Sequence, residues 1–172
     1  MKRDEILDLG LPHSRETVRR LAMVHNVSAP DLKLADVLTI SPNPTLSVYF
    51  SGLFDQFGWA VVRRDSCESA IDFLRRNRAA VAICEEELPD GGWKSVIRAA
   101  GAMPDPPSFV VIGEEAPLWK EVSRLGGFDV LTRPLREADV VWTVASAWHH
   151  WMKQTEMRDQ QQEEERPVIH AG

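Results

Sequence analysis

Glu85, Glu86 and Glu87 are three consecutive acidic residues, with Asp90 three positions farther on. Carboxylates in such a group could hold a divalent metal ion, or could act as a general acid and a general base. The group directly follows an apolar run that is typical of a strand, and neighbouring side chains at a strand end point in alternate directions. The four carboxylates therefore converge poorly, and their spacing favours a solvated acidic loop over a metal or catalytic site.

Histidine and cysteine show no spacing that is typical of metal ligands. His149 and His150 are adjacent, so on a helix their side chains lie about 100° apart and do not converge on one ion. Cys84 lies within an apolar run and is expected to be a small core residue. Cys67 stands near a helix start, a position that can lower the pKa of a thiol. The two cysteines form no CxxC motif, and we expect reduced thiols without a redox role.

The elements that must position these groups follow from the hydrophobic pattern. Five short apolar runs alternate with helical patterns, at residues 36–41, 59–62, 79–84, 109–112 and 128–131. The third run, Ala79–Cys84, is continuous, as in a central parallel strand that is covered on both faces. Asn43 and Pro44 are suited to the cap and first turn of the first helix. The alternation predicts a doubly wound, five-stranded parallel α/β sheet with helices on both faces. The functional edge of such a sheet lies at the carboxyl ends of its strands.

Two short motifs lie at that predicted edge. Leu88–Gly92, with the sequence LPDGG, follows the third strand, and Leu131–Pro134, with the sequence LTRP, follows the fifth. In this setting, from about Ala35 to Trp151, the sequence resembles a bacterial response-regulator receiver domain. The resemblance implies a flavodoxin-like fold and a role in two-component phosphorelay signalling. In that family, two acids after the first strand and an aspartate after the third hold Mg²⁺, and the aspartate takes a phosphoryl group. A hydroxyl after the fourth strand and a lysine after the fifth bind that group.

The resemblance assigns most of these roles to residues that do not suit them. The two acids fall on Ser41 and Pro42, and the phosphoacceptor position is Glu85. The hydroxyl position is Gly113, the aromatic switch position is Val130, and the lysine position is Arg133. A single dependable carboxylate makes a poor Mg²⁺ site, because this ion gives up its water ligands reluctantly. We therefore expect a degenerate pseudo-receiver that has no enzymatic activity, binds no Mg²⁺ or other cofactor and undergoes no aspartyl phosphorylation.

Two arrangements of Glu85 remain open. Glu85 could form an ion pair with Arg133 across the cleft and so hold the domain in one activated-like state. An exposed pair contributes only about 0–1 kcal/mol, which is enough to bias a nearly balanced equilibrium. Alternatively, Glu85 is a solvated loop acid like its neighbours Glu86 and Glu87.

Tryptophan residues mark a candidate interaction surface. Trp148 fits the buried stripe of the last helix, whereas Trp142 and Trp151 fit it less well, and Trp119 stands on the preceding helix. The resemblance implies pairing through the fourth helix, the fifth strand and the fifth helix. We expect Trp119, Trp142 and Trp151 to serve a homodimer, or an interface with a sensor kinase or a downstream effector. The alternative is that these rings only cover the edges of the core.

The sequence divides into three segments. Residues 1–33 form an N-terminal extension with one helix, which Ser14 is placed to cap, and residues 34–153 form the receiver-like domain. Residues 154–172 are polar, and we expect a frayed helix that runs into a disordered tail. The N-terminal helix carries several arginines, but a single helix is no DNA-binding domain, so we interpret it as a docking or linker segment.

Charge and hydropathy exclude several classes of function. The chain has 172 residues with 20 basic and 26 acidic side chains, and its net charge of -6 argues against binding to nucleic acid. No apolar run is long enough to span a membrane, and the N-terminus does not resemble a secretory signal. We expect a stand-alone cytoplasmic signalling protein that acts through protein–protein interaction. One alternative is a phosphorylatable receiver that uses Glu86 or Asp90. A second is a flavodoxin-like domain that binds a small ligand, although the first strand is followed by no glycine-rich phosphate loop.

Overall fold

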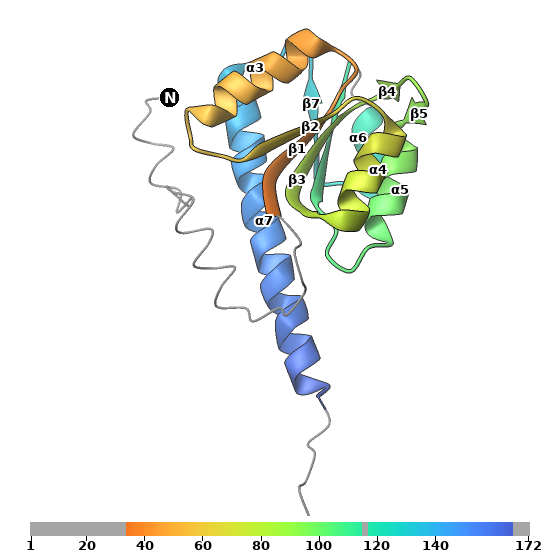
Figure 1. Cartoon of the computed structure of the whole chain (residues 1–172), viewed down its shortest axis with the longest axis vertical. Helices are drawn as coiled ribbons and strands as arrows, with labels where there is room; N and C mark the ends of the chain where they lie inside the picture. The colour runs from red at the N-terminus through yellow and green to blue at the C-terminus, as the bar shows by residue number, and fades with distance from the viewer. Residues whose placement is uncertain (1–33, 115–116, 167–172) are drawn as a thin grey trace, which may run out of the picture.

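A five-stranded parallel sheet forms the centre of the computed structural model, which describes residues 34–114 and 117–166 (Figure 1). Its strands lie in the order β2-β1-β3-β6-β7, and each neighbouring pair is parallel. The strands are β1 (Leu34–Ile40), β2 (Val61–Arg64), β3 (Arg78–Glu85), β6 (Ser108–Gly113) and β7 (Asp129–Thr132). The predicted doubly wound sheet is confirmed, whereas the helix predicted after Ser14 lies outside the described residues.

The position of β3 at the centre of the sheet follows from its composition. All residues from Ala79 to Cys84 are buried, with β1 on one side and β6 on the other. The register places Ile40 beside Cys84 and Glu85 beside Ile112. The residues that follow β1, β3, β6 and β7 therefore meet at one edge of the sheet, which we call the carboxyl edge. The opposite edge, where these strands begin, is the amino edge.

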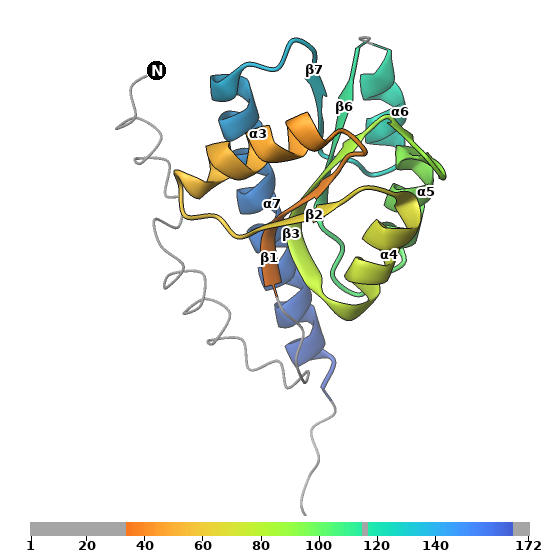
Figure 2. The ribbon, with the colours of Figure 1, turned by 45° about the horizontal axis from the view of Figure 1, so that its top comes forward.

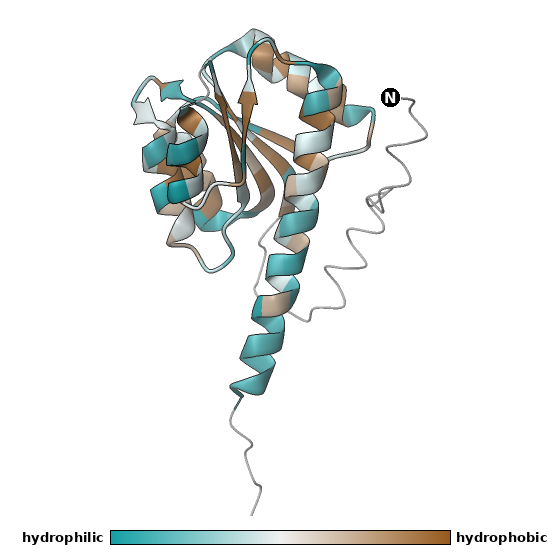
Figure 3. Cartoon of the chain, turned by 180° about the vertical axis from the view of Figure 1, so that it is seen from behind, coloured by the Kyte–Doolittle hydropathy of each residue, from teal (hydrophilic) through white to brown (hydrophobic). Residues whose placement is uncertain are grey.

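In the described part of the chain, five helices cover the two faces of the sheet (Figure 2). One face carries α3 (Pro44–Asp55) and α7 (Glu137–Glu164). The other face carries α4 (Cys67–Arg76), α5 (Trp93–Gly101) and α6 (Leu118–Arg124). The apolar strands lie between these helices, and the far end of α7 is hydrophilic (Figure 3).

The two faces have separate cores because the strand side chains alternate between them. On the first face, the rings of Phe50 and Phe54 stack with centroids 5.6 Å apart and pack against α7. On the second face, Ala70, Val96 and Val122 are fully or almost fully buried. Both faces of the sheet are thereby sealed, so open chemistry is confined to its two edges.

The start of α3 confirms the predicted cap. The side-chain oxygen of Asn43 accepts hydrogen bonds from the backbone N–H groups of Thr45 and Leu46, and Pro44 occupies the first turn. At the start of α4, Ser66 is the cap and exchanges hydrogen bonds with Ser69.

Two boundaries in the first half of the domain also differ from the prediction. β2 begins at Val61 because the N–H of Ala60 donates to the buried carboxylate of Asp36 at 2.6 Å, outside the strand ladder. Trp59 instead packs against the rings of Phe54 and Phe57. The predicted acidic loop contains a short antiparallel hairpin, formed by β4 (Glu87–Leu88) and β5 (Gly91–Gly92).

The largest difference concerns the polar segment from residue 154 onward, for which we expected a frayed helix that runs into disorder. Through Glu164 the segment is instead a continuous part of α7, which extends past the end of the sheet (Figure 1). The hydroxyl of Thr155 donates to Asp105 at 3.3 Å, and the guanidinium of Arg158 does so at 2.6 Å. Arg78, at the start of β3, binds the other oxygen of the same carboxylate. A polar composition was taken as a sign of disorder, whereas these polar groups attach the helix to the domain.

Within the described ranges, each helix is too short or too polar to span a lipid bilayer.

Candidate functional site

The carboxyl edge brings four of the predicted site residues together. Ser41 follows β1, Glu85 ends β3, Gly113 ends β6, and Arg133 follows β7. The strand register pairs Gly113 with Thr132, and the backbone N–H of Arg133 donates to the carbonyl of Gly113 at 3.2 Å. Residues that lie up to 92 positions apart in the sequence are therefore neighbours.

Glu85 lies at the centre of this group and is bound from two sides. A guanidinium nitrogen of Arg133 lies 2.5 Å from Glu85 Oε1, and Ser41 Oγ donates to Glu85 Oε2 at 2.6 Å. The Glu85 side chain is only 12% exposed, and that of Arg133 is 38% exposed. The ion pair with Arg133 is therefore present, and the alternative of a solvated loop acid is wrong for Glu85.

Ser41 forms a turn where typical receivers carry an acid. Its side chain is almost fully buried, and its Oγ accepts a hydrogen bond from the backbone N–H of Asn43 at 2.9 Å while donating to Glu85. Pro42 is exposed and has no side-chain oxygen. These two positions therefore connect the end of β1 to β3 and to the cap of α3.

Gly113, which the resemblance assigned to the hydroxyl position, ends β6 beside Leu118. A Cβ atom built on this glycine would overlap the Leu118 side chain and would lie 3.0 Å from Glu86 Oε2. Leu118 is buried, so it has little freedom to move away. The space that a hydroxyl side chain would need is already filled.

Of the remaining acids of the loop, Glu86 reaches the space beside Gly113, whereas Asp90 points away toward α4. Asp90 accepts hydrogen bonds from the backbone N–H groups of Cys67 (2.7 Å) and Glu68 (2.9 Å) at the start of α4. These bonds, that of Glu68 first, lower the pKa of the Asp90 carboxyl. Among residues 34–114 and 117–166, no three His, Cys, Asp or Glu side chains gather into a possible metal site.

The residues at the carboxyl edge do not fit a Mg²⁺ ion. Mg²⁺ prefers several oxygen ligands in octahedral geometry, whereas the carboxylates near this group are those of Glu85 and, beside Gly113, Glu86. Both oxygens of Glu85 already accept hydrogen bonds, one of them from a cationic guanidinium. Arg133 therefore already provides positive charge beside Glu85.

Val130 and the two cysteines pack in or against the core of the second face. Val130 is half-buried and packs against the second core. Burial raises the pKa of the Cys84 thiol strongly. The pKa of Cys67 is also raised, first by burial and then by the charge of Asp90, so the lowering that a helix start can cause is not seen.

Of the three tryptophans predicted at an interface, two are exposed and one is buried. Trp119 on α6 is 53% exposed and Trp142 on α7 is 50% exposed. Trp151 is only 4% exposed, so its assignment to an interaction surface is wrong. Its ring packs against Trp148 and lies under the guanidinium of Arg78, 5.4 Å from centroid to Cζ.

Solved structures of receiver domains are similar to this chain. A signal receiver domain from Vibrio parahaemolyticus has 17% identity and a TM-score of 0.66, over 73% of this chain and 98% of that chain. A CheY-like receiver domain protein from Methanospirillum hungatei JF-1 has 12% identity and a TM-score of 0.63, over 72% and 99%. The chain has the receiver fold.

A third similar structure contains a metal ion. It is the receiver domain of a sensor histidine kinase from Pseudomonas aeruginosa PAO1, with a magnesium ion coordinated in its active-site cleft. Its identity to this chain is 17% and its TM-score is 0.60, over 67% of this chain and 98% of that chain. No protein-family model and no curated protein matches the sequence. The likeness therefore concerns the receiver fold.

Two contributors to the site were missed from the sequence. Ser41 was taken only as a replaced acid, although its hydroxyl binds Glu85, and Leu118 was taken only as a helix residue, although it fills the space beside Gly113. A glycine at the hydroxyl position is the one signal that could have indicated a bulky neighbour there. The bond from Ser41 depends on the register between β1 and β3 and has no sequence signature.

Proposed function

We propose that this chain is a receiver-fold signalling protein that acts through protein–protein contacts and does not use a phosphorylated carboxylate. The observation that carries the proposal is the state of Glu85, whose two oxygens are bound by Ser41 and Arg133. Each of these bonds draws electron density from the Glu85 oxygen that accepts it and so makes that oxygen a weaker nucleophile toward phosphorus. Without a resident metal, the negative charges of carboxylate and phosphodonor would also repel each other.

The contacts around Glu85 supply the constraint that phosphorylation supplies in typical receivers. Arg133 and Ser41 join the ends of β7, β1 and β3 through one carboxylate. Because β7 leads directly into α7, the ion pair also restrains the start of that helix. The domain then presents one conformation of α6, β7 and α7 without a phosphorylation signal.

The exposed tryptophans on α6 and α7 support a protein partner. Trp119 and Trp142 each leave about half of a large ring in solvent, and tryptophan is enriched among residues that dominate binding energy. We propose this surface for a second copy of the chain, a sensor kinase or a downstream effector. A small-ligand function at the carboxyl edge is not favoured, since Glu85 and Leu118 fill the positions around which such a ligand would bind.

The proposal is tested by intact-protein mass spectrometry after incubation with acetyl phosphate, with and without Mg²⁺. Wild type and Glu85→Asp are compared with a phosphorylatable receiver domain as the positive control. We expect the control to gain a phosphoryl group and the wild-type chain to gain none. A stable Mg²⁺-dependent adduct on wild type would contradict the proposal. Its location on Glu86 or Asp90 would then favour a phosphorylatable receiver.

A further inference from the structure

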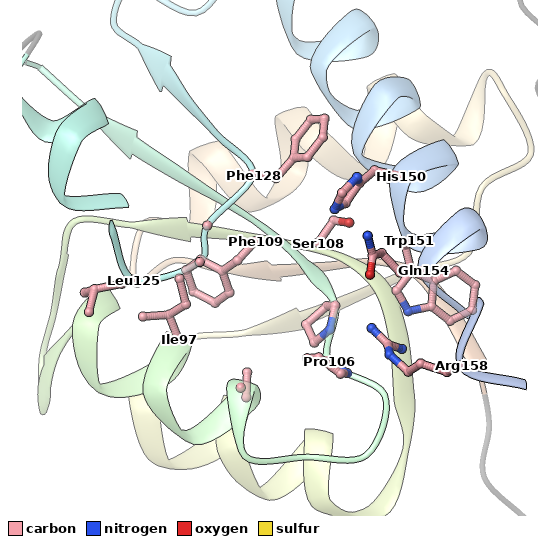
Figure 4. A pocket seen from close by; sticks show the side chains of 15 residues that line it. Ile97, Pro106, Ser108, Phe109, Leu125, Phe128, His150, Trp151, Gln154 and Arg158 are labelled. Carbon is pink, nitrogen blue, oxygen red and sulfur yellow. The ribbon is translucent and has the colours of Figure 1, made fainter. Parts of the chain in front are cut away.

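A pocket lies at the amino edge of the sheet, on the opposite side of the domain from Glu85. It has a volume of about 490 Å³ and lies between α5, α7 and the loops that lead into β6 and β7 (Figure 4). Its apolar wall includes Ile97, Phe109 and Phe128. Pockets for small organic ligands have volumes of about 300–1,000 Å³, so this pocket is large enough to hold one.

The polar groups of the pocket lie mainly on α7. His150, Gln154 and Arg158 stand along one side of the helix and face the apolar wall (Figure 4). No described residue that lines the pocket carries a carboxyl group. The lining therefore offers hydrogen-bond donors and positive charge to an apolar space, which favours an amphipathic anion over a cation.

The indole of Trp151 also lines this pocket and has an unfulfilled hydrogen bond. The side chain is 4% exposed, and its nitrogen has no hydrogen-bond partner among the described residues. A buried N–H without an acceptor costs about 1–3 kcal/mol, and buried tryptophans usually find one. The nitrogen-bearing edge of the ring is turned toward the side of Gln154 and Arg158 (Figure 4). An acceptor atom placed there would remove this cost.

Arg158 is a second hydrogen-bond donor at this point of the pocket, and Asp105 holds it in place. One of its guanidinium nitrogens donates to Asp105 Oδ1 at 2.6 Å, and Arg78 binds the other oxygen of that carboxylate. Two guanidinium groups thus share one carboxylate, and these three side chains together carry one net positive charge. A guanidinium has five N–H donors, so Arg158 can donate into the pocket while it remains bound to Asp105.

We propose that this pocket binds a small organic monocarboxylate with an aromatic or branched aliphatic body. The carboxylate accepts hydrogen bonds from the indole N–H of Trp151 and from Arg158. The apolar body lies against Ile97, Phe109 and Phe128. The site is separate from the Glu85 cleft and does not depend on the proposed function.

The test is a titration of the ¹⁵N-labelled full chain with 4-phenylbutyrate, followed through the indole N–H signals of the tryptophans. Trp151→Phe identifies the Trp151 signal by its loss. We expect that signal to shift saturably below about 10 mM ligand while the Trp142 signal stays in place. The uncharged analogue 4-phenylbutanamide should bind at least about tenfold more weakly, because it cannot pair with a guanidinium.

Variants on α7 test the two donors. Arg158→Gln and Trp151→Phe should each weaken 4-phenylbutyrate binding at least about fivefold. Lys153→Gln and Trp142→Phe are the matched controls on the same helix, since neither residue lines the pocket, and both should leave the affinity unchanged.

Three results would overturn the proposal. The first is the absence of a saturable shift of the Trp151 signal, and the second is equal affinity for the carboxylate and the amide. Both are measured on the wild-type chain, so they do not depend on how well a variant folds. The third is a nuclear Overhauser contact in the free protein between the Trp151 indole and residues 1–33, which would mean that the chain itself fills the pocket.

Discussion

The two edges of the same sheet differ in how completely their polar groups are bound. At the carboxyl edge, both oxygens of Glu85 have partners and Leu118 fills the space beside Gly113. At the amino edge, Trp151 has a buried N–H without a partner, next to an open pocket. Parallel α/β sheets usually place their chemistry at the carboxyl ends of the strands. In this chain that edge is closed by its own side chains, and the open recess lies at the other one.

The largest effect is expected from Trp151, on which the amino edge is built. Trp151→Ala removes a buried ring and should lower the free energy of unfolding by about 3–5 kcal/mol. Trp142→Ala, on the same helix but half exposed, should lower it by less than about 1 kcal/mol. Urea unfolding of both variants measures the difference. Equal losses would show that the two rings are buried to the same extent, and the description of the amino edge as built on a buried Trp151 would then be wrong.

Gly113→Ala tests whether the carboxyl edge is closed by packing. The new methyl group must displace buried Leu118, so we expect a loss of about 1–3 kcal/mol in the free energy of unfolding. Gly52→Ala on α3 is the matched control, because nothing lies within 4 Å of its added Cβ. The control should stabilise the chain by about 0.5–1 kcal/mol. A neutral Gly113→Ala would mean that this edge can open at little cost.

The Glu85–Arg133 pair is expected to have a smaller effect on stability. A double-mutant cycle with Glu85→Gln and Arg133→Gln should give a coupling energy of about 1 kcal/mol, since solvent screens the partly exposed Arg133. Arg136→Gln replaces Arg133→Gln in the control cycle and should give additive effects. A coupling energy of zero, measured by urea unfolding, would remove the restraint on which the proposed function depends.

Asp90 should give the smallest effect, which is confined to acid pH. The N–H groups of Glu68 and Cys67 lower its pKa in the folded chain. Its contribution is therefore fully present above the unfolded-state pKa of about 3.9 and is lost as the pH falls through the lower folded value. Asp90→Asn should flatten the decline of stability below about pH 4, in thermal unfolding across a pH series. An unchanged decline would mean that Asp90 does not cap α4 in solution.

The fold could be predicted from the sequence because its signals are local. The apolar run at Ala79–Cys84 identifies the central strand, and Asn43 with Pro44 identifies the start of α3. The positions of Glu85 and Arg133 followed from short motifs at strand ends. Their pairing was one of two alternatives, because a loop acid beside two further acids has the same pattern whether it is solvated or bound.

The features that could not be predicted from the sequence depend on contacts between segments that lie far apart in it. Asp105 binds Arg78 and Arg158, which lie 27 and 53 residues away, and no short pattern encodes such a triad. The same contacts explain why α7 continues beyond the predicted boundary at residue 153. Trp151 was placed on the surface because the helical stripe is ambiguous there, whereas the structure buries it against Trp148 and the guanidinium of Arg78.

The anchoring of α7 by Asp105 has a geometric consequence. A continuous helix rises about 1.5 Å and turns about 100° per residue, so Trp142 and Met157 lie about 22 Å apart along its axis and about 60° apart around it. Both side chains are about half exposed, and the bond from Arg158 to Asp105 holds the helix against the domain close to Met157. α7 therefore sets a fixed spacing between two apolar contact points, and a single partner that used both would need a rigid surface of matching length.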